Sequence, residues 1–308
     1  MKIKILLIYI TSCFLLSCNS YNTFFKKTGN SNSITFKKLE RLNLSNTGNA
    51  IIYEQLGKCL NLHSLNLSNN ANLDFEIALR LIKNPSKLKV LILDDNDLSK
   101  IPEAIIRFRN LEQLSLNKNP KLNLLSTLSK LQSLPLQFLN LQENDLAALP
   151  NTIEELKELK DLNLTNNKIS DNETFKYLKK LPKLESLWLN KNELKTLPKG
   201  LFNLKNIKNL YIENNELLTI PDAIVAMQKV WVIHVGHNLL EELPLALTKM
   251  PSLLLVHANN NKIKYVPEVY GTKKSNVKGL VLNNNNIPNK TKAYLKKQAR
   301  LFFILSLD

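Results

Sequence analysis

One apolar pattern, L-x-x-L-x-L-x-x-N, recurs along most of this 308-residue chain and restricts it to a stack of similar units. The copy from Leu62 to Asn70 is complete, and a degenerate first copy begins at Leu39 with Thr47 in place of the asparagine. The eleven copies are spaced 23 to 26 residues apart. A unit of this length cannot bury an apolar face alone, so each copy must be sealed by its neighbours. The other copies begin at Leu88, Leu111, Leu136, Leu159, Leu184, Ile207, Val230, Leu253 and Val277.

The pattern predicts a short strand at the start of each copy. The second and third aliphatic positions, such as Leu187 and Leu189, are two residues apart, so both side chains point to one face of a strand. That face is expected to form the interior of the stack.

The asparagine that closes the pattern is predicted to be structural. Its amide group has two donor hydrogens and an acceptor oxygen, and a polar side chain inside an apolar stack must be hydrogen-bonded. A column of such amides can bond the turn backbone of its own copy and of the neighbouring copies. The predicted ladder consists of Asn70, Asn96, Asn119, Asn144, Asn167, Asn192, Asn215, Asn238, Asn261 and Asn285.

The return half of many copies contains a proline step, as at Leu149-Pro150. Proline lacks a backbone donor and is tolerated at the first position of a helix, so each step predicts a turn or a short helical or 3-10 segment. The copies that lead into Leu88, Leu136 and Leu184 lack this proline and are longer, which predicts fuller helices such as one over 172–180. Because helices are wider than strands, the stack should curve with its strands inside.

These repeats resemble those of the leucine-rich repeat family, in its 23-residue L-P-x-x type. The resemblance covers about residues 39–288. It implies an α/β fold, a curved solenoid with a parallel sheet on its concave face and short helices, 3-10 segments and turns on its convex face. Members of the family usually recognise proteins or glycans. We therefore expect a leucine-rich repeat domain of about eleven repeats over residues 37–288.

The last twenty residues, 289–308, are expected to form an amphipathic capping helix. An open solenoid end exposes its core, so a cap is needed. A membrane anchor here is a weaker alternative, because the apolar run from Leu301 to Leu305 is far too short to span a bilayer.

Four ring-bearing residues occupy the same outward position in consecutive copies: Trp188, Tyr211, His234 and His257, which we call the aromatic stripe. Neighbouring strands lie about 4.8 Å apart, so the stripe should be on the order of 15 Å long. Exposed rings on a rigid face are typical anchors for a partner. Alternatively, the rings stabilise the sheet by cross-strand stacking, or the histidines form a pH-sensitive contact. The predicted partner-binding residues are Phe138, Trp188, Tyr211, Glu213, His234 and His257.

The first seventeen residues have the features of a secretory signal. Lys2 and Lys4 precede an apolar stretch over 5–16, which is too short to span a membrane. We expect residues 1–17 to be a signal peptide. A plain secretory signal with an incidental cysteine, or an uncleaved anchor, remains an alternative.

The segment from Leu15 to Cys18 resembles the lipobox of bacterial lipoproteins. In that family the cysteine is lipidated and becomes the new N-terminus, which would make residues 18–36 a lipidated cysteine and a tether. Cys13 is a second candidate, with a shorter apolar run before it. Asn19, where an aspartate would by analogy indicate inner-membrane retention, favours an outer-membrane anchor. The expected location is the cell envelope, with the protein facing either the periplasm or the outside.

The net charge of +16 by itself suggests an anionic partner. The lysines are scattered along the chain among asparagine-rich turns, however, so we interpret them as a solvated surface. The leading hypothesis is a membrane-anchored protein that recognises a protein partner through its concave sheet. The alternative is a cell-surface adhesin that binds an anionic glycan or lipid through its basic surface. A nucleic-acid partner is not expected, and the chain is expected to be a monomer.

The sequence contains no motif that indicates catalysis. It has no G-x-S-x-G, no H-E-x-x-H and no phosphate-binding loop, so we expect no enzyme activity and no cofactor. His234, His237 and His257 fall in adjacent copies, but no cysteine or carboxylate is placed beside them as a ligand, so no metal is expected. After cleavage at Cys18, Cys59 would be the only free thiol, and it is best explained as a small buried residue.

Overall fold

The computed structural model describes residues 36–308, so the signal peptide, Cys13, Cys18 and the tether up to residue 35 lie outside the described residues. Twelve strands of three residues form one sheet in chain order. The strands are β1 (Arg41–Asn43), β2 (Ser64–Asn66), β3 (Val90–Ile92), β4 (Gln113–Ser115), β5 (Phe138–Asn140), β6 (Asp161–Asn163), β7 (Ser186–Trp188), β8 (Asn209–Tyr211), β9 (Val232–His234), β10 (Leu255–His257), β11 (Gly279–Val281) and β12 (Ile304–Ser306).

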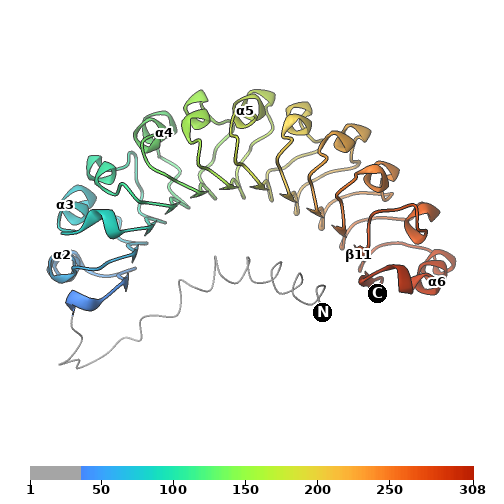
Figure 1. Cartoon of the computed structure of the whole chain (residues 1–308), viewed down its shortest axis with the longest axis horizontal. Helices are drawn as coiled ribbons and strands as arrows, with labels where there is room; N and C mark the ends of the chain where they lie inside the picture. The colour runs from blue at the N-terminus through green and yellow to red at the C-terminus, as the bar shows by residue number, and fades with distance from the viewer. Residues whose placement is uncertain (1–35) are drawn as a thin grey trace.

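Every strand pairs in parallel with the next one, and equivalent positions of the repeat face one another. Leu187 of β7 pairs with Leu210 of β8, for example, and Trp188 pairs with Tyr211. The sheet lines the inside of an arc, and the helices follow its outside (Figure 1). The predicted curved solenoid with a concave parallel sheet is confirmed.

Within residues 36–288, four α-helices lie along the convex side, and 3-10 helices fill the other coils. The three longer copies contain α3, α4 and α5, as the sequence predicted, although α5 ends at Leu178 and not at residue 180. The α-helices are α2 (Asn49–Lys58), α3 (Phe75–Arg80), α4 (Leu124–Leu131) and α5 (Asn172–Leu178). The 3-10 helices are η1 (Phe36–Lys38), η2 (Pro85–Lys87), η3 (Glu103–Arg107), η4 (Asn151–Glu155), η5 (Lys199–Asn203), η6 (Asp222–Ala226), η7 (Leu245–Lys249) and η8 (Glu268–Gly271).

The prolines of the predicted steps precede the 3-10 helices and do not occupy their first helical position, which corrects the sequence prediction. They are Pro102, Pro150, Pro198, Pro221, Pro244 and Pro267. Pro102 is extended, with φ −64° and ψ 149°, and its carbonyl accepts the first helical hydrogen bond from the N–H of Ile105. The same bond joins Pro150 to Ile153. Extended backbone is the conformation that proline fits best outside a helix, so each proline turns the chain into the convex segment.

The core is one continuous column of aliphatic side chains. Leu91, Leu114 and Leu139 occupy the same position in successive strands, and none of them is exposed to solvent. Larger side chains fill the space under the convex helices, where Phe175 and Tyr270 are buried. The Tyr270 hydroxyl donates to the carbonyl of Pro244 at 2.6 Å, so its polar atom is satisfied.

The asparagine ladder joins each coil to the coil before it. The Asn119 amide nitrogen donates to the carbonyls of Leu93 at 3.0 Å and Leu116 at 3.1 Å. Its side-chain oxygen accepts the N–H groups of Asn96 at 3.2 Å and Leu98 at 3.0 Å. All ten ladder residues donate to a carbonyl of the preceding coil and accept an N–H group from it.

The residue before each ladder position lies in the left-handed region of backbone space. Asparagine is tolerated there, but Lys118, Glu143, Lys191 and His237 adopt the same conformation, with φ between 53° and 57°. A longer side chain in this region stores strain, which the ladder bonds on either side of the turn hold in place. The sharp turn after each strand therefore depends on the neighbouring asparagine.

The C-terminal segment is more than the predicted capping helix. Helix α6 (Asn289–Lys297) and η9 (Ala299–Leu301) are followed by β12, which pairs with β11 and extends the sheet. Leu305 and Leu307 take the positions of the second and third leucines of the repeat, and Phe302 takes the first. The segment 289–308 thus completes one more coil, whose leading residue is aromatic and was therefore missed.

Replacing Asn119 by leucine should lower the free energy of unfolding by about 2–4 kcal/mol, because it leaves buried turn N–H and C=O groups unpaired. Urea denaturation followed by circular dichroism measures this loss. The matched control is Asn110→Ala, which removes one exposed bond to the carbonyl of Ser86 and should cost less than about 1 kcal/mol. Equal losses in the two variants would contradict the structural role of the ladder.

Candidate functional site

The aromatic stripe forms a continuous stack across the concave sheet. The ring centroids of Trp188 and Tyr211 are 4.9 Å apart, those of Tyr211 and His234 are 4.5 Å apart, and those of His234 and His257 are 4.4 Å apart. The angles between successive ring planes are 1°, 22° and 9°. At the other end, Phe138 meets Trp188 edge-on, with a centroid separation of 6.5 Å and an angle of 81°.

The stack follows directly from the register of the sheet. In-register parallel strands place equivalent side chains about 4.8 Å apart, close to the spacing that stacked rings prefer. Four rings at one repeat position therefore meet face to face. Tyr211 in the middle is buried, while Trp188, His234 and His257 are half-buried.

Stacking decides which part of each ring a partner can reach. The faces of Tyr211 and His234 are covered by their neighbours, so only the ring edges remain for a ligand. Those edges carry the polar atoms: an indole N–H, a phenol hydroxyl and imidazole nitrogens. The stripe can therefore offer a row of hydrogen-bonding groups between apolar edges, and it offers no free inner face against which a sugar ring could stack.

Burial disfavours the charged form of both histidines of the stripe. Loss of hydration lowers the pKa of His234 to about 3, with a smaller contribution from the charge of His257. Burial also lowers the pKa of His257. With its pKa at about 3, the His234 imidazole is neutral near neutral pH, and burial disfavours the charged form of His257. The alternative of a pH-sensitive contact stays a prediction.

Glu213 lies beside the stripe but forms no ion pair with it. Its carboxylate oxygen is 3.8 Å from His234 Nδ1, too far for a hydrogen bond, and the neutral imidazole carries no charge to attract it. Burial raises the pKa of the Glu213 carboxyl. The structure thus brings the predicted partner-binding residues to one region of the concave face, and their binding role stays a prediction.

The concave face has two chemically different halves. Strands β1 to β6 present mostly polar side chains. In the turn after β3, Asp94 accepts a hydrogen bond from the N–H of Asn117 at 2.9 Å and one from the Ser115 hydroxyl at 2.5 Å. Burial raises the pKa of Asp94 to about 6. From β7 onward, the stripe is accompanied by apolar residues such as Val232 and Leu255, which are buried. At the two outward positions of each described strand, Arg41 is the only Lys or Arg.

Gly279 extends the apolar half in a way that the sequence did not reveal. A Cβ atom at this position would lie 2.5 Å from Leu255 Cδ1 and 2.9 Å from Phe303 Cζ. The missing side chain therefore lets Leu255 and Phe303 close over the strand. Leu255 belongs to β10, and Phe303 directly precedes β12, a strand that was not recognised from the sequence.

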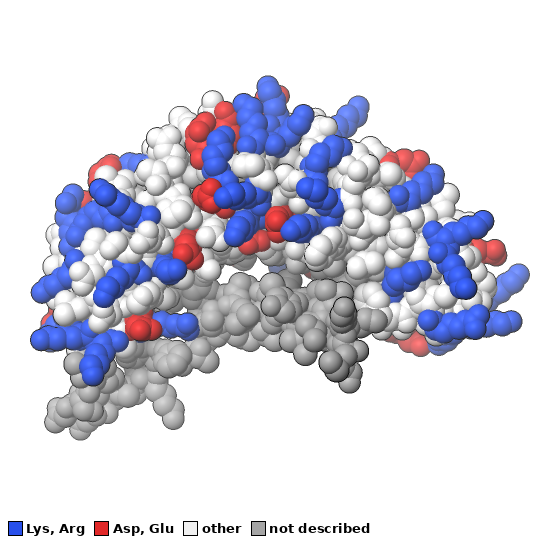
Figure 2. Space-filling model, in the orientation of Figure 1, with Lys and Arg blue, Asp and Glu red and all other residues white. Residues whose placement is uncertain are grey.

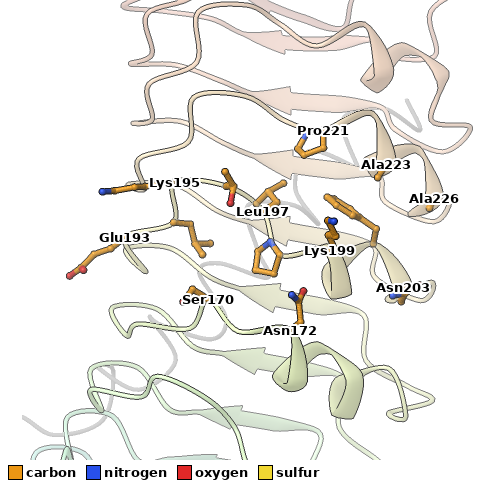
Figure 3. Close-up of a pocket in the computed structure, with 14 residues that line it drawn as sticks. Ser170, Asn172, Glu193, Lys195, Leu197, Lys199, Asn203, Pro221, Ala223 and Ala226 are labelled. Atoms are coloured by element: carbon orange, nitrogen blue, oxygen red, sulfur yellow. The ribbon is translucent and has the colours of Figure 1, made fainter.

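A groove of about 1050 Å³ opens beside α5, η5 and η6, away from the stripe (Figure 3). Its lining is mainly apolar and includes Leu197, Phe202 and Pro221. Glu193 and Lys195 point outward from its rim (Figure 3). The lining residues include no cysteine or histidine and no serine–histidine pair, so they offer no arrangement typical of nucleophilic catalysis.

Other predicted features lie apart from the stripe. His237 is in a left-handed turn, where its Nε2 is 3.1 Å from Asn260 Nδ2. Within residues 36–308, no group of three or more His, Cys, Asp or Glu side chains could hold a metal ion.

Cys59 is buried, and burial raises the pKa of its thiol to about 11, so the thiolate is disfavoured. Between residues 36 and 308, no helix is both long and apolar enough to cross a membrane.

Comparison with known proteins identifies the architecture. A profile of the family described as "Leucine rich repeat" matches residues 182–240. A comparison with curated protein sequences gives no match. The fold is a leucine-rich repeat solenoid. The leucine-rich repeat profile thus matches the part of the chain that carries Trp188, Tyr211 and His234.

Two solved leucine-rich repeat structures show the extent of the similarity. The crystal structure of a TLR13–ssRNA13 complex contains a chain that is 26% identical, with a TM-score of 0.71 over 88% of this chain. The present chain spans only 39% of the length of that protein. An internalin (inlF) from Listeria monocytogenes is 20% identical, with a TM-score of 0.57 and 87% of each chain covered, and it supports the fold alone.

The low pKa of His234 should make the protein less stable in acid. The unfolded chain binds a proton below about pH 6.5, whereas folded His234 stays neutral down to about pH 3, so stability is lost as the pH falls through this window. His234→Phe keeps a ring in the stack and removes the titrating group. Between pH 7.5 and 5.0, the unmodified chain should lose about 2 kcal/mol more unfolding free energy than the variant.

Urea denaturation at the two pH values measures this difference. The raised pKa of Asp94 acts in the opposite direction, but it is common to both proteins and cancels in the comparison. An identical pH dependence in the two proteins would show that His234 is not held neutral in the fold.

Proposed function

We propose that this chain is a lipid-anchored envelope protein that recognises a protein partner through the aromatic stripe. The observation that carries the proposal is the stack from Trp188 to His257 on the concave face. A rigid row of aromatic edges with polar tips gives a partner both apolar contact and hydrogen bonds at a small cost in conformational entropy. Leucine-rich repeat proteins are generally recognition modules, which agrees with a role in binding and not in catalysis.

The charge distribution favours a partner with little negative charge at this face. The outward positions of the described strands carry the carboxylate of Asp161 near the centre of the sheet and a single cation, Arg41, at one end, and the carboxylate of Asp94 lies two residues after the end of β3. A polyanion gains its affinity from many cations, so this surface is poorly suited to nucleic acid or an acidic glycan. The TLR13 chain was crystallised in complex with single-stranded RNA. Because the concave face of the present chain has so few cations, we do not propose that the stripe binds RNA.

The envelope location rests on the first eighteen residues. The short apolar stretch and the resemblance of residues 15–18 to a lipobox support export and lipidation of Cys18, with Cys13 as the second candidate. Asn19 supports an outer-membrane anchor by analogy with other lipoproteins. An adhesin that binds an anionic glycan or lipid is the alternative function, and it would use the basic side chains away from the concave face.

Replacing both Trp188 and Tyr211 by alanine should abolish partner binding, because it removes the two largest rings of the stripe. Full-length chain would be used as bait in a detergent extract of the native envelope, and a recovered partner would then be purified and titrated against each variant. We expect the affinity to fall at least about a hundredfold, since two central anchors are lost.

The matched control is Trp231→Ala, an exposed ring outside the stripe whose loss should leave the affinity unchanged. If the partner binds the double variant and the unmodified chain equally well, the stripe is a structural stack only. Circular dichroism of both variants shows whether the solenoid remains folded.

Cys18→Ser should prevent lipid attachment. Cells that express the chain would be labelled with a clickable palmitate analogue, and the labelled protein would be detected on a gel. We expect Cys18→Ser to lose the label and Cys13→Ser to retain it. Retention of the label in Cys18→Ser, with its loss in Cys13→Ser, would assign the modification to the other cysteine.

A further inference from the structure

Positive charge is concentrated on one side of the coil. Each coil has a descending segment, which runs from the end of the first convex helix after a strand to the next strand. These segments contain sixteen Lys or Arg and four Asp or Glu, a net charge of +12. Residues 36–308 contain 38 basic and 26 acidic side chains, a net charge that is also +12. The descending segments therefore account for the whole net charge of residues 36–308. The descending segments are residues 39–40, which precede β1, and residues 59–63, 81–89, 108–112, 132–137, 156–160, 179–185, 204–208, 227–231, 250–254, 272–278 and 298–303.

The opposite side of the coil has no such excess. The ascending segments, from each strand to the convex helix that follows it, contain eight basic and twelve acidic side chains. The lysines are scattered along the sequence, as we interpreted them, but in the folded chain the excess of basic over acidic side chains is concentrated on one side of each coil. We call the side formed by the descending segments the descending flank.

Most cations of the descending flank have no acidic partner. Three of its four carboxylates are each paired with one lysine, in the pairs of Lys89 with Glu112, Lys183 with Glu158, and Lys208 with Glu185. Lys180 pairs with a carboxylate of η4. None of the ion pairs within residues 36–308 includes the other twelve cations: Lys83, Lys87, Arg109, Lys157, Lys160, Lys179, Lys205, Lys229, Lys273, Lys274, Lys278 and Arg300.

These cations form one extended surface. The strands are parallel and in register, so the descending segments all reach the sheet from the same side of the arc. Twelve strands at about 4.8 Å give the row a length of about 50 Å. Figure 2 shows a side of the arc on which Lys and Arg clearly outnumber Asp and Glu from one end to the other.

Large apolar side chains interrupt the basic row directly before β9 and β10, toward its C-terminal end. Trp231 is 45% exposed, and Leu254 occupies the same position in the next coil and is 36% exposed. Lys208 Nζ lies 5.8 Å from the centroid of the Trp231 ring. An exposed indole next to lysines, with an aliphatic neighbour, is the combination that favours the interface between lipid headgroups and acyl chains.

We propose that the descending flank lies against an anionic lipid surface, with Trp231 and Leu254 entering the headgroup region. Figure 1 looks along the shortest axis of the molecule, so the arc is thin in the direction in which its two flanks face, and a flank can approach a flat bilayer. Lysines without an acidic partner attract acidic headgroups. Trp231 and Leu254 add an apolar contact, which binding of a lipid surface uses and binding of a dissolved linear polyanion does not require. This contact leaves the concave face and the aromatic stripe free.

Trp231 provides a direct readout of this contact. The chain has two tryptophans, so Trp188→Phe leaves Trp231 as the only one. The full-length chain would carry this change together with Cys13→Ser and Cys18→Ser, which exclude acylation. With vesicles of phosphatidylglycerol and phosphatidylcholine, Trp231 emission should shift to the blue and the protein should sediment with the vesicles. Pure phosphatidylcholine, or the same mixed vesicles in 0.5 M salt, should give no shift, since salt screens the attraction.

Two variants, each with four lysines replaced and therefore with the same change in net charge, test whether the lipid contact is on the descending flank. Lys157, Lys160, Lys205 and Lys229 are exposed on the descending flank, and replacing all four by glutamine should weaken vesicle binding at least about tenfold. The control replaces four exposed lysines of the ascending flank in the same way and should bind like the unmodified chain. Its positions are Lys168, Lys191, Lys195 and Lys262.

Three results would overturn the proposal. The first is equal weakening in the two quadruple variants, which would show an effect of net charge alone. The second is sedimentation with vesicles without a shift in Trp231 emission, which would place the contact elsewhere on the chain. The third is failure to bind vesicles while heparin or single-stranded RNA binds through the descending-flank lysines, which would assign the surface to a linear polyanion. None of these results bears on partner binding by the stripe.

Discussion

The whole structure depends on one constraint: no coil can bury its leucines without the coil beside it. A three-residue strand and a short helix enclose too little volume for a core, so the aliphatic side chains of each repeat become inaccessible only when the next repeat covers them. Leu91, Leu114 and Leu139 are fully buried because their equivalents lie directly above and below them. Packing therefore fixes the register of the sheet, and the register fixes everything else.

Because the register is fixed, any residue type that recurs at one repeat position becomes a column in space. Asparagines at the turn become a ladder of bonds between coils. Four rings at one outward position become a stack with separations of 4.4 to 4.9 Å. Lysines near the start of the strands become the basic flank. One geometric rule thus converts patterns that are distributed along the sequence into continuous surfaces with different chemistry.

The sequence predicted the features that follow from this rule alone. The strand positions, the curvature, the ladder residues and the neighbourhood of Trp188, Tyr211 and His234 all depend only on repeat spacing. It did not predict features that depend on three-dimensional contacts. His234 is stacked between rings on two other strands, and burial lowers its pKa. The contact of Phe303 with Gly279 needs the coil that ends in β12. That strand was overlooked because Phe302 replaces the leucine that identifies the other repeats.

The direction of the ladder bonds has a consequence for how such a chain can evolve. Every ladder amide bonds backward, to the coil before it, so each boundary between coils contains the same set of donors and acceptors. Duplication or loss of one whole repeat joins two boundaries that already match, and it leaves no buried amide without a counterpart. An insertion of a few residues within a strand or its turn breaks that match. We therefore expect the length of the arc to change between descendants by whole repeats more readily than by insertions within a strand or its turn.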